Sequence, residues 1–303
     1  MADSILYLCR VVSEGPADFS FSDAELLVRR IREERQSPAL FARYLDLVGA
    51  IRGEAWSDVE PLLSQIAELT RGEASFAIAP FSREGIGKDY QRFPEILFTK
   101  DYGTQPMLEV SAAEFEKVRD HLVSGLDLVS RIDPQLRHEI KSLWVRIFVG
   151  GSNPDAGGRA FAGVTSFLLW GATFLNTRYY DSFEKAVEFL VHESTHSLLF
   201  ALSCEEPLVL NRLDERYQSP LRTDPRPMDG IFHATLVSAR IACFMNAWLE
   251  SGGQQEATLL KRRRDASARA FNDGEHTILQ HARLSDLAEN LLEQAQEAVG
   301  EIA

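Results

Sequence analysis

The sequence contains little cysteine, and the cysteines that it has are far apart. Cys9, Cys204 and Cys243 are the three cysteines among 303 residues. Three scattered thiols supply neither a disulfide framework nor a Cys-x-x-Cys pair for a zinc site. We therefore expect a protein of a reducing compartment, the cytoplasm, with the cysteines packed as small apolar side chains.

Basic residues are also few relative to acidic ones. The chain has 32 Lys and Arg residues against 45 Asp and Glu residues, so its formal net charge is −13 at pH 7. A field of this sign repels polyphosphate and lacks the basic footprint of a DNA- or RNA-binding protein. We therefore expect no nucleic-acid partner.

Long hydrophobic runs are absent. No stretch approaches the roughly 20 apolar residues that a membrane-spanning helix needs. The first residues carry Asp3 where a signal peptide has a basic segment. The overall composition, 45% hydrophobic and 25% charged, is nevertheless typical of a globular chain. We expect a folded protein with no membrane partner.

The spacing of apolar residues predicts a largely helical chain with a small sheet. Helical spacing between Ser22 and Thr70 predicts three helices, and helical patterns dominate again after Asp181. Between these regions, short apolar, aromatic and β-branched runs predict strands. The predicted strands lie at 76–81, 96–98, 143–149, 161–170 and 173–176. We expect an α+β, predominantly helical fold with three segments, 1–72, 73–180 and 181–303, in one compact unit.

The strongest chemical signal is the sequence Val191-His192-Glu193-Ser194-Thr195-His196. Asp181 and Glu184 form a capping pair that predicts a helix over 182–202. On a helix, imidazoles four residues apart project from one face, roughly 6 Å apart along the axis. This spacing lets two neutral nitrogens reach one divalent ion at about 2.0–2.1 Å, while Glu193 points near its open coordination position.

The residues around this motif favour a metal site over a chance match. Apolar side chains cover most faces of the predicted helix, so His192, Glu193 and His196 are expected to be largely buried. Buried polar groups need partners, and a metal ion supplies them. The alternative is a chance His-Glu-x-x-His sequence on a surface helix, which is common for so short a pattern. A chance match is expected on a solvated helix and is less expected on the apolar helix predicted here.

Two histidines do not hold an ion tightly, so a third ligand is expected from downstream. Glu205 and Glu206 follow the predicted helix directly. Asp214 or Glu215 would match the glutamate ligand of thermolysin-like peptidases, which comes from a second helix. We prefer His233, because it begins a mostly apolar helix after a proline-rich segment.

That proline-rich segment contains two cations. Its three prolines at 220, 225 and 227 stiffen the backbone and disfavour helix before each of them. Arg222 and Arg226 are its basic residues. They either pair with Asp224 and Asp229, or grip a carboxylate beside the metal in a bidentate manner.

Two segments together resemble a known bacterial family. They are Val191-His-Glu-x-x-His196 and Tyr217-x-Ser-Pro-x-Arg222-x-Asp-Pro-Arg226-Pro-x-x-Gly230-x-x-His233. They resemble the HExxH-motif domain family, associated with the maturation of ribosomally made, post-translationally modified peptides. Members resemble zinc peptidases at the motif, and the family includes iron- and 2-oxoglutarate-dependent peptide β-hydroxylases. The resemblance covers residues 191–233.

The resemblance implies a fold and a set of roles. It implies a zincin-like core with a small sheet beside the motif helix. His192, His196 and His233 would bind Fe(II), Glu193 would orient a bound group, and Arg222 or Arg226 would hold 2-oxoglutarate. The other partners would be dioxygen and a precursor peptide. Such oxygenases usually employ two histidines and one carboxylate, so Glu215 or Asp229 could replace His233, which leaves the metal open.

Two other functions remain open. A zinc metallopeptidase would use Glu193 as general base for a zinc-bound water, with Glu215 as the third ligand and purely structural roles for both arginines. A non-catalytic peptide-binding module would use a closed metal site to join two helices.

Overall fold

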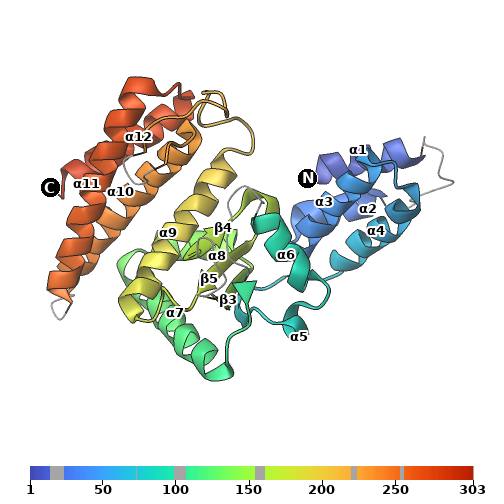
Figure 1. The fold of residues 1–303 in the computed structure, drawn as a ribbon, viewed down its shortest axis with the longest axis horizontal. Coiled ribbons are helices and arrows are strands. Elements are labelled where there is room, and N and C mark those ends of the chain that lie inside the picture. The colour runs from blue at the N-terminus through green and yellow to red at the C-terminus, as the bar shows by residue number, and fades with distance from the viewer. Residues whose placement is uncertain are drawn as a thin grey trace. The chain divides into compact units, whose positions relative to one another are not determined.

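The computed structural model describes residues 1–13, 24–72, 74–98, 107–153, 161–219, 224–252 and 256–302. Within these ranges the chain is mostly helical, with a small mixed sheet, which confirms the expected α+β class. It forms two compact units (Figure 1). The first unit is Met1–Arg119 with Trp144–Tyr179, and the second is Asp120–Leu143 with Tyr180–Ala303. The division into three segments that we predicted from the sequence stays a prediction.

The first unit combines helices with the sheet. Its helices are α1 (Ala2–Ser13), α2 (Ala24–Glu33), α3 (Pro38–Arg52), α4 (Trp56–Leu69), α5 (Arg83–Ile86), α6 (Asp89–Leu97) and the 3₁₀ helix η2 (Phe167–Leu169). Its strands are β1 (Ala77–Pro80), β2 (Met107–Leu108), β3 (Arg146–Ser152), β4 (Gly163–Thr165) and β5 (Ala172–Asn176).

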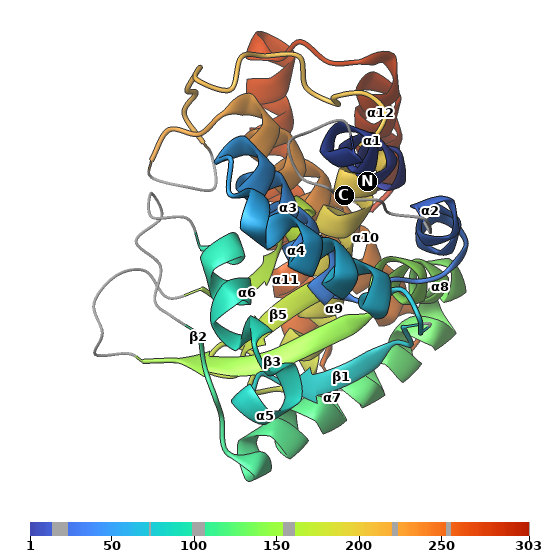
Figure 2. The same cartoon turned by 90° about the vertical axis from the view of Figure 1, so that its right-hand side faces the viewer.

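The sheet is mixed, with β3 at its centre (Figure 2). The strand order is β1-β3-β5-β4, with β2 also paired to β3. β1 and β5 run parallel to β3, whereas β2 is antiparallel to β3 and β4 is antiparallel to β5. β5 is buried along its whole length because neighbours cover both its edges and both its faces.

One predicted strand is wrong and another is shortened. Residues 96 and 97 end helix α6, in which Phe93 and Ile96 are buried one helical turn apart. The apolar run at 96–98 was too short to separate a strand from the end of a helix. The run at 161–170 forms β4 and then η2, which begins after Ser166.

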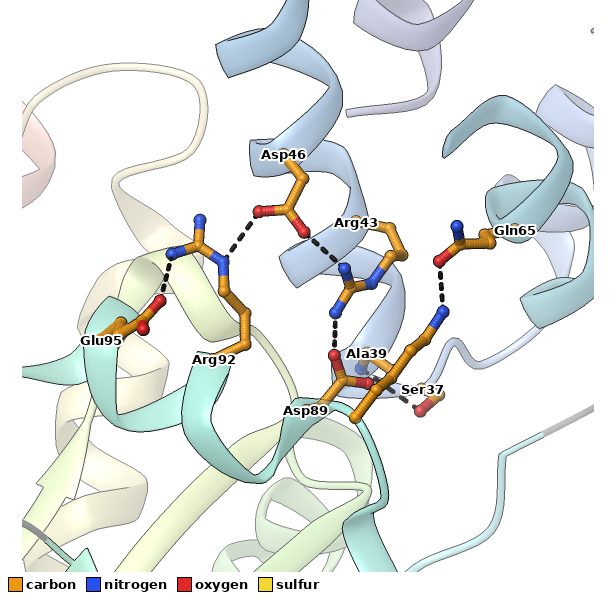
Figure 3. A network of polar contacts seen from close by, with 9 residues as sticks. Ser37, Ala39, Arg43, Asp46, Gln65, Asp89, Arg92 and Glu95 are labelled. Atoms are coloured by element: carbon orange, nitrogen blue, oxygen red, sulfur yellow. Dashed lines mark hydrogen bonds and ion pairs between the residues drawn. The ribbon is translucent and has the colours of Figure 1, made fainter. Parts of the chain in front are cut away.

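Charged side chains join α3 to α6 in the first unit (Figure 3). Arg43 pairs with both Asp46 and Asp89, and Arg92 donates to Asp46 at 2.7 Å. Asp89 is 5% exposed, so its charge depends on the guanidinium of Arg43 for compensation. Removing one partner of such a buried pair leaves an uncompensated charge, so the network fixes how the two helices meet.

The second unit is built from helices, which are joined between α9 and α10 by an irregular segment with two isolated β-bridges. Its helices are the C-terminal part of α7 (Ala112–Ile132), then α8 (Pro134–Leu143), α9 (Phe183–Leu202), α10 (Met228–Glu250), α11 (Ala257–His281) and α12 (Asp286–Gly300). α10, α11 and α12 lie side by side (Figure 1) around a core that includes Phe232, Phe271 and Leu292. In the described ranges, no helix has both the length and the apolar composition needed to cross a bilayer.

α10 and α11 approach closely where Gly274 meets Thr235. A Cβ atom at Gly274 would overlap Thr235 Oγ1, and it would lie 3.1 Å from Thr235 Cβ. That hydroxyl is itself held by a 2.8 Å hydrogen bond to the Ile231 carbonyl. Gly274 therefore permits a distance between the two helices that no larger residue allows.

Gly274→Ala is expected to lower the free energy of unfolding by about 1–3 kcal/mol, because the added methyl group overpacks the α10–α11 contact. Gly49→Ala in α3 is the matched control, because a Cβ there meets nothing within 4 Å. This control should gain up to about 1 kcal/mol, since alanine is the better helix former. Urea unfolding of both variants checks the opposite signs, and equal effects would contradict the close contact.

Candidate metal centre

Helix α9 carries the His-Glu-x-x-His motif in the second unit. Ser182 caps this helix by accepting from the Lys185 amide, so the cap lies one residue after the predicted Asp181. α7 packs against α9 closely enough that a Cβ at Gly125 would lie 3.2 Å from Leu190. Such packing holds the backbone of the motif rigidly.

His192 and His196 lie one turn apart on the same helix. Their ring centroids are 5.0 Å apart, with the rings inclined at 63°. His192 keeps 41% of its side-chain surface exposed. Both rings line a pocket, so each can contact a ligand without leaving the helix.

Tertiary folding brings His233 of α10 against His196. The two Nδ1 atoms are 3.3 Å apart, and the rings stack with an interplanar angle of 19°. Two nitrogens on one tetrahedral ion, each at about 2.0–2.1 Å, would also be about 3.3 Å apart. The spacing of this pair suits two ligands of one metal ion, and it equally suits a hydrogen bond between the two rings.

The protein environment favours the neutral, metal-binding form of all three imidazoles. Desolvation lowers the pKa of His192 to about 4. Desolvation also lowers the pKa of His196, as do His192 and His233 nearby. For His233, desolvation again lowers the pKa, although Asp229 opposes the shift. The lone pairs of the rings are therefore not blocked by protonation at pH 7.

The nitrogens of the three rings do not converge on one point in this structure. Among the residues that the structure describes, no group of three or more His, Cys, Asp or Glu side chains is arranged to hold an ion. His196 and His233 face each other directly, whereas His192 contacts His196 by its ring edge. Three donors on one ion would thus require side-chain rotation at His192.

The rival third ligands are engaged elsewhere. Glu215 accepts a 2.7 Å hydrogen bond from the Tyr217 hydroxyl and a 3.3 Å bond from Asn211. Asp214 receives two 2.9 Å hydrogen bonds from Arg212 at the surface. Glu205 and Glu206 are exposed beyond the end of α9. Of the candidates weighed from the sequence, His233 is the one in direct contact with the motif.

Glu193 is a buried carboxylate next to the first histidine. It is 3% exposed, and its Oε1 lies 4.0 Å from His192 Nε2. Burial raises the pKa of the Tyr180 phenol, and the charges of Glu193 and Glu188 add to this effect. Tyr180 was missed by the sequence analysis, because nothing in its local pattern places its ring near α9.

The motif histidines open into a pocket of about 320 Å³. Its walls come from α9, from α10 and from the segment between them. The lining residues are His192, His196, Ser219, Arg226, Gly230, Ala234, Val237, Ser238 and Ile241. The α10 residues recur every three to four positions, so they share one face of that helix. The sequence alone did not predict this wall of the pocket. The small residues at 230, 234 and 238, spaced four apart, indicate that one face of α10 leaves room for a ligand.

Arg226 brings a cation to the same pocket. Its backbone exchanges hydrogen bonds of 2.9 and 2.8 Å with Tyr217, which fixes its position. Its Nη2 pairs with Asp224 at 2.8 Å, which is one of the two roles expected from the sequence. Its Nε is buried and has no hydrogen-bond partner among the described residues. Arg222, the other candidate, lies outside the described residues.

The arrangement combines neutral nitrogen donors, a buried carboxylate and a guanidinium. Neutral imidazoles suit a divalent transition metal, and the guanidinium suits a carboxylate ligand. Arg226 lines the pocket together with His192 and His196, so a carboxylate ligand there would lie near its guanidinium. The chain matches no protein-family model and no curated protein at a significant level.

Proposed function

We propose that this protein is an iron(II)- and 2-oxoglutarate-dependent hydroxylase that acts on the β-carbon of a residue in a ribosomally made precursor peptide. The observation that carries the proposal is the shared pocket of His192, His196 and Arg226, with His233 stacked on His196. One atom of dioxygen would enter a C–H bond of the peptide. The other would oxidise 2-oxoglutarate to succinate and carbon dioxide.

The histidines would hold the metal. Bound Fe(II) would supply the oxygen chemistry, for which protein side chains alone are unsuited. Imidazole binds ferrous iron as well as zinc, and three ligands from the protein leave positions for other groups. Glu193, buried beside His192, would orient a group bound at those positions. A zincin-like core belongs to the same proposal.

Arg226 would bind the distal carboxylate of 2-oxoglutarate. A planar guanidinium matches a carboxylate with two parallel hydrogen bonds, and Asp224 occupies only one of its nitrogens. The apolar α10 wall, Ala234, Val237 and Ile241, would cover the methylene groups and exclude water. The peptide as second substrate is carried by the resemblance of residues 191–233 to the HExxH-motif domain.

A zinc peptidase is the second candidate. The closeness of the Glu193 carboxylate to His192 favours it, because a general base must lie near the metal-bound water. That reaction needs no keto acid, so it gives no role to the buried Nε of Arg226. The place of Arg226 in the wall of the pocket, beside both motif histidines, is the reason for preferring the hydroxylase.

Anaerobic reconstitution tests the two candidates. The metal-free protein is loaded with Fe(II) or Zn(II) and titrated with 2-oxoglutarate. A visible charge-transfer band with Fe(II) and the keto acid, followed by succinate formation in air, is the expected result. A candidate precursor peptide should gain one oxygen in mass spectrometry under the same conditions. Backbone cleavage with zinc alone, without any band or succinate, would establish the peptidase instead.

A further inference from the structure

His233 lies between two partners, and each faces a different nitrogen of its ring. Nδ1 is 3.3 Å from His196 Nδ1, and Nε2 is 3.8 Å from Asp229 Oδ1. Asp229 precedes His233 by four residues in α10, so the two side chains share one helix face. The His233 side chain is 8% exposed, whereas that of Asp229 is 52% exposed.

A neutral imidazole has one proton for its two nitrogens. When one nitrogen offers its lone pair to a metal ion, the proton must sit on the other, and a hydrogen-bond acceptor there fixes this choice. The lone pair of His233 is useful only on the side of His196, because the second motif histidine lies there. The two Nδ1 atoms are within hydrogen-bond distance, so one of the two rings donates a proton there. With His196 as that donor, the proton of His233 lies on Nε2, where Asp229 is the carboxylate in reach.

We propose that Asp229 is a positioning residue that accepts the Nε2 proton of His233 and so directs its Nδ1 lone pair toward the metal. This inference rests on the metal centre of the proposed function. The observed 3.8 Å is longer than a direct hydrogen bond. Asp229 is 52% exposed, so a rotation of its side chain would close that difference. On this assignment Asp229 acts through His233 and is not itself a metal ligand.

A second role for Asp229 must be separated from this one. It lies in the first turn of α10, where a negative charge stabilises the helix dipole. Asp286 occupies the first turn of α12 and is exposed, and no ion pair with a histidine is found for it among the described residues. Asp286→Ala therefore removes the same dipole interaction without touching a candidate ligand.

Titration with Co(II), a spectroscopic probe of the site, tests the inference. Asp229→Ala should bind Co(II) about 10–100-fold more weakly than the wild type, the usual cost of losing the carboxylate behind a ligating histidine. Asp286→Ala should bind like the wild type, and Asp229→Glu should recover part of the loss. In the metal-free protein, ¹⁵N chemical shifts of the His233 ring should show the Nε2–H tautomer. Asp229→Ala should show a mixture of tautomers.

The two readouts separate the failure of this inference from failure of the proposed function. Unchanged affinity together with unchanged ring shifts in Asp229→Ala would overturn the role of Asp229, even with an intact metal centre. If the wild type itself binds no Co(II), the metal centre is wrong. The ring shifts then decide alone whether Asp229 sets the tautomer of His233.

Discussion

His233→Ala is expected to weaken divalent-metal binding by about two to three orders of magnitude. Metal binding of about 10–16 kcal/mol through three or four protein ligands corresponds to about 3–5 kcal/mol for each ligand. Each 1.4 kcal/mol is about a tenfold change in affinity. The contact of His233 with His196 makes it the third donor in this estimate. Competition with a chromophoric chelator measures the dissociation constant.

Glu215→Ala is the control for this prediction. Its carboxylate already accepts from Tyr217 and Asn211, so metal affinity should stay within about twofold of the wild type. The reverse result, a large loss with Glu215→Ala and little with His233→Ala, would make Glu215 the third ligand and favour a peptidase-like site. Because His233 is buried, circular dichroism of the metal-free variant must first show that α10 is still folded.

Arg226→Ala is expected to raise the concentration of 2-oxoglutarate needed for half-maximal effect by about 10–100-fold. A hydrogen bond to a charged group contributes about 1.5–3 kcal/mol, and the alanine variant loses that interaction with the carboxylate. The backbone bridge to Tyr217 does not depend on the side chain, so the loop should stay in place. Titration of the Fe(II) charge-transfer band with the keto acid measures the change.

Two further variants sharpen that experiment. Arg226→Lys keeps the charge but loses the bidentate geometry, so it should lie between the wild type and the alanine variant. Arg212→Ala lies in the same connecting segment, but its guanidinium pairs with exposed Asp214, so it should have no effect. If Arg226→Ala binds 2-oxoglutarate like the wild type, Arg226 is not the carboxylate anchor. Metal binding should be nearly unchanged in all three variants.

Local patterns were sufficient for much of the fold. The helices α2, α3 and α4 follow from apolar residues at helical spacing between Ser22 and Thr70. The strands β1, β3 and β5 follow from compact apolar runs. The predicted strand at 96–98 failed, because the run is the buried end of an amphipathic helix. Three residues are fewer than one turn, so they carry no period that separates the two structures.

The candidate site also contains features that local sequence patterns predicted and features that they left open. Four-residue spacing by itself determined that His192 and His196 share a face of a helix, because helix geometry is local. The sequence left the third donor open among His233, Asp214, Glu215 and other acids. Tertiary structure places His233 against the motif, by packing α10 against α9, and pairs Glu215 with Tyr217 instead, but the third ligand itself stays a prediction.

The sequence by itself determined the helical character of the chain, its acidic charge and the spacing of the His-Glu-x-x-His motif, since each depends on composition or on neighbours within one turn. Tertiary structure alone decided that His233 stacks on His196, that Arg226 reaches the same pocket and that Asp229 faces the far nitrogen of His233. These contacts join residues of different elements or fix the direction of side chains. Both depend on packing across the whole unit, which no local pattern encodes.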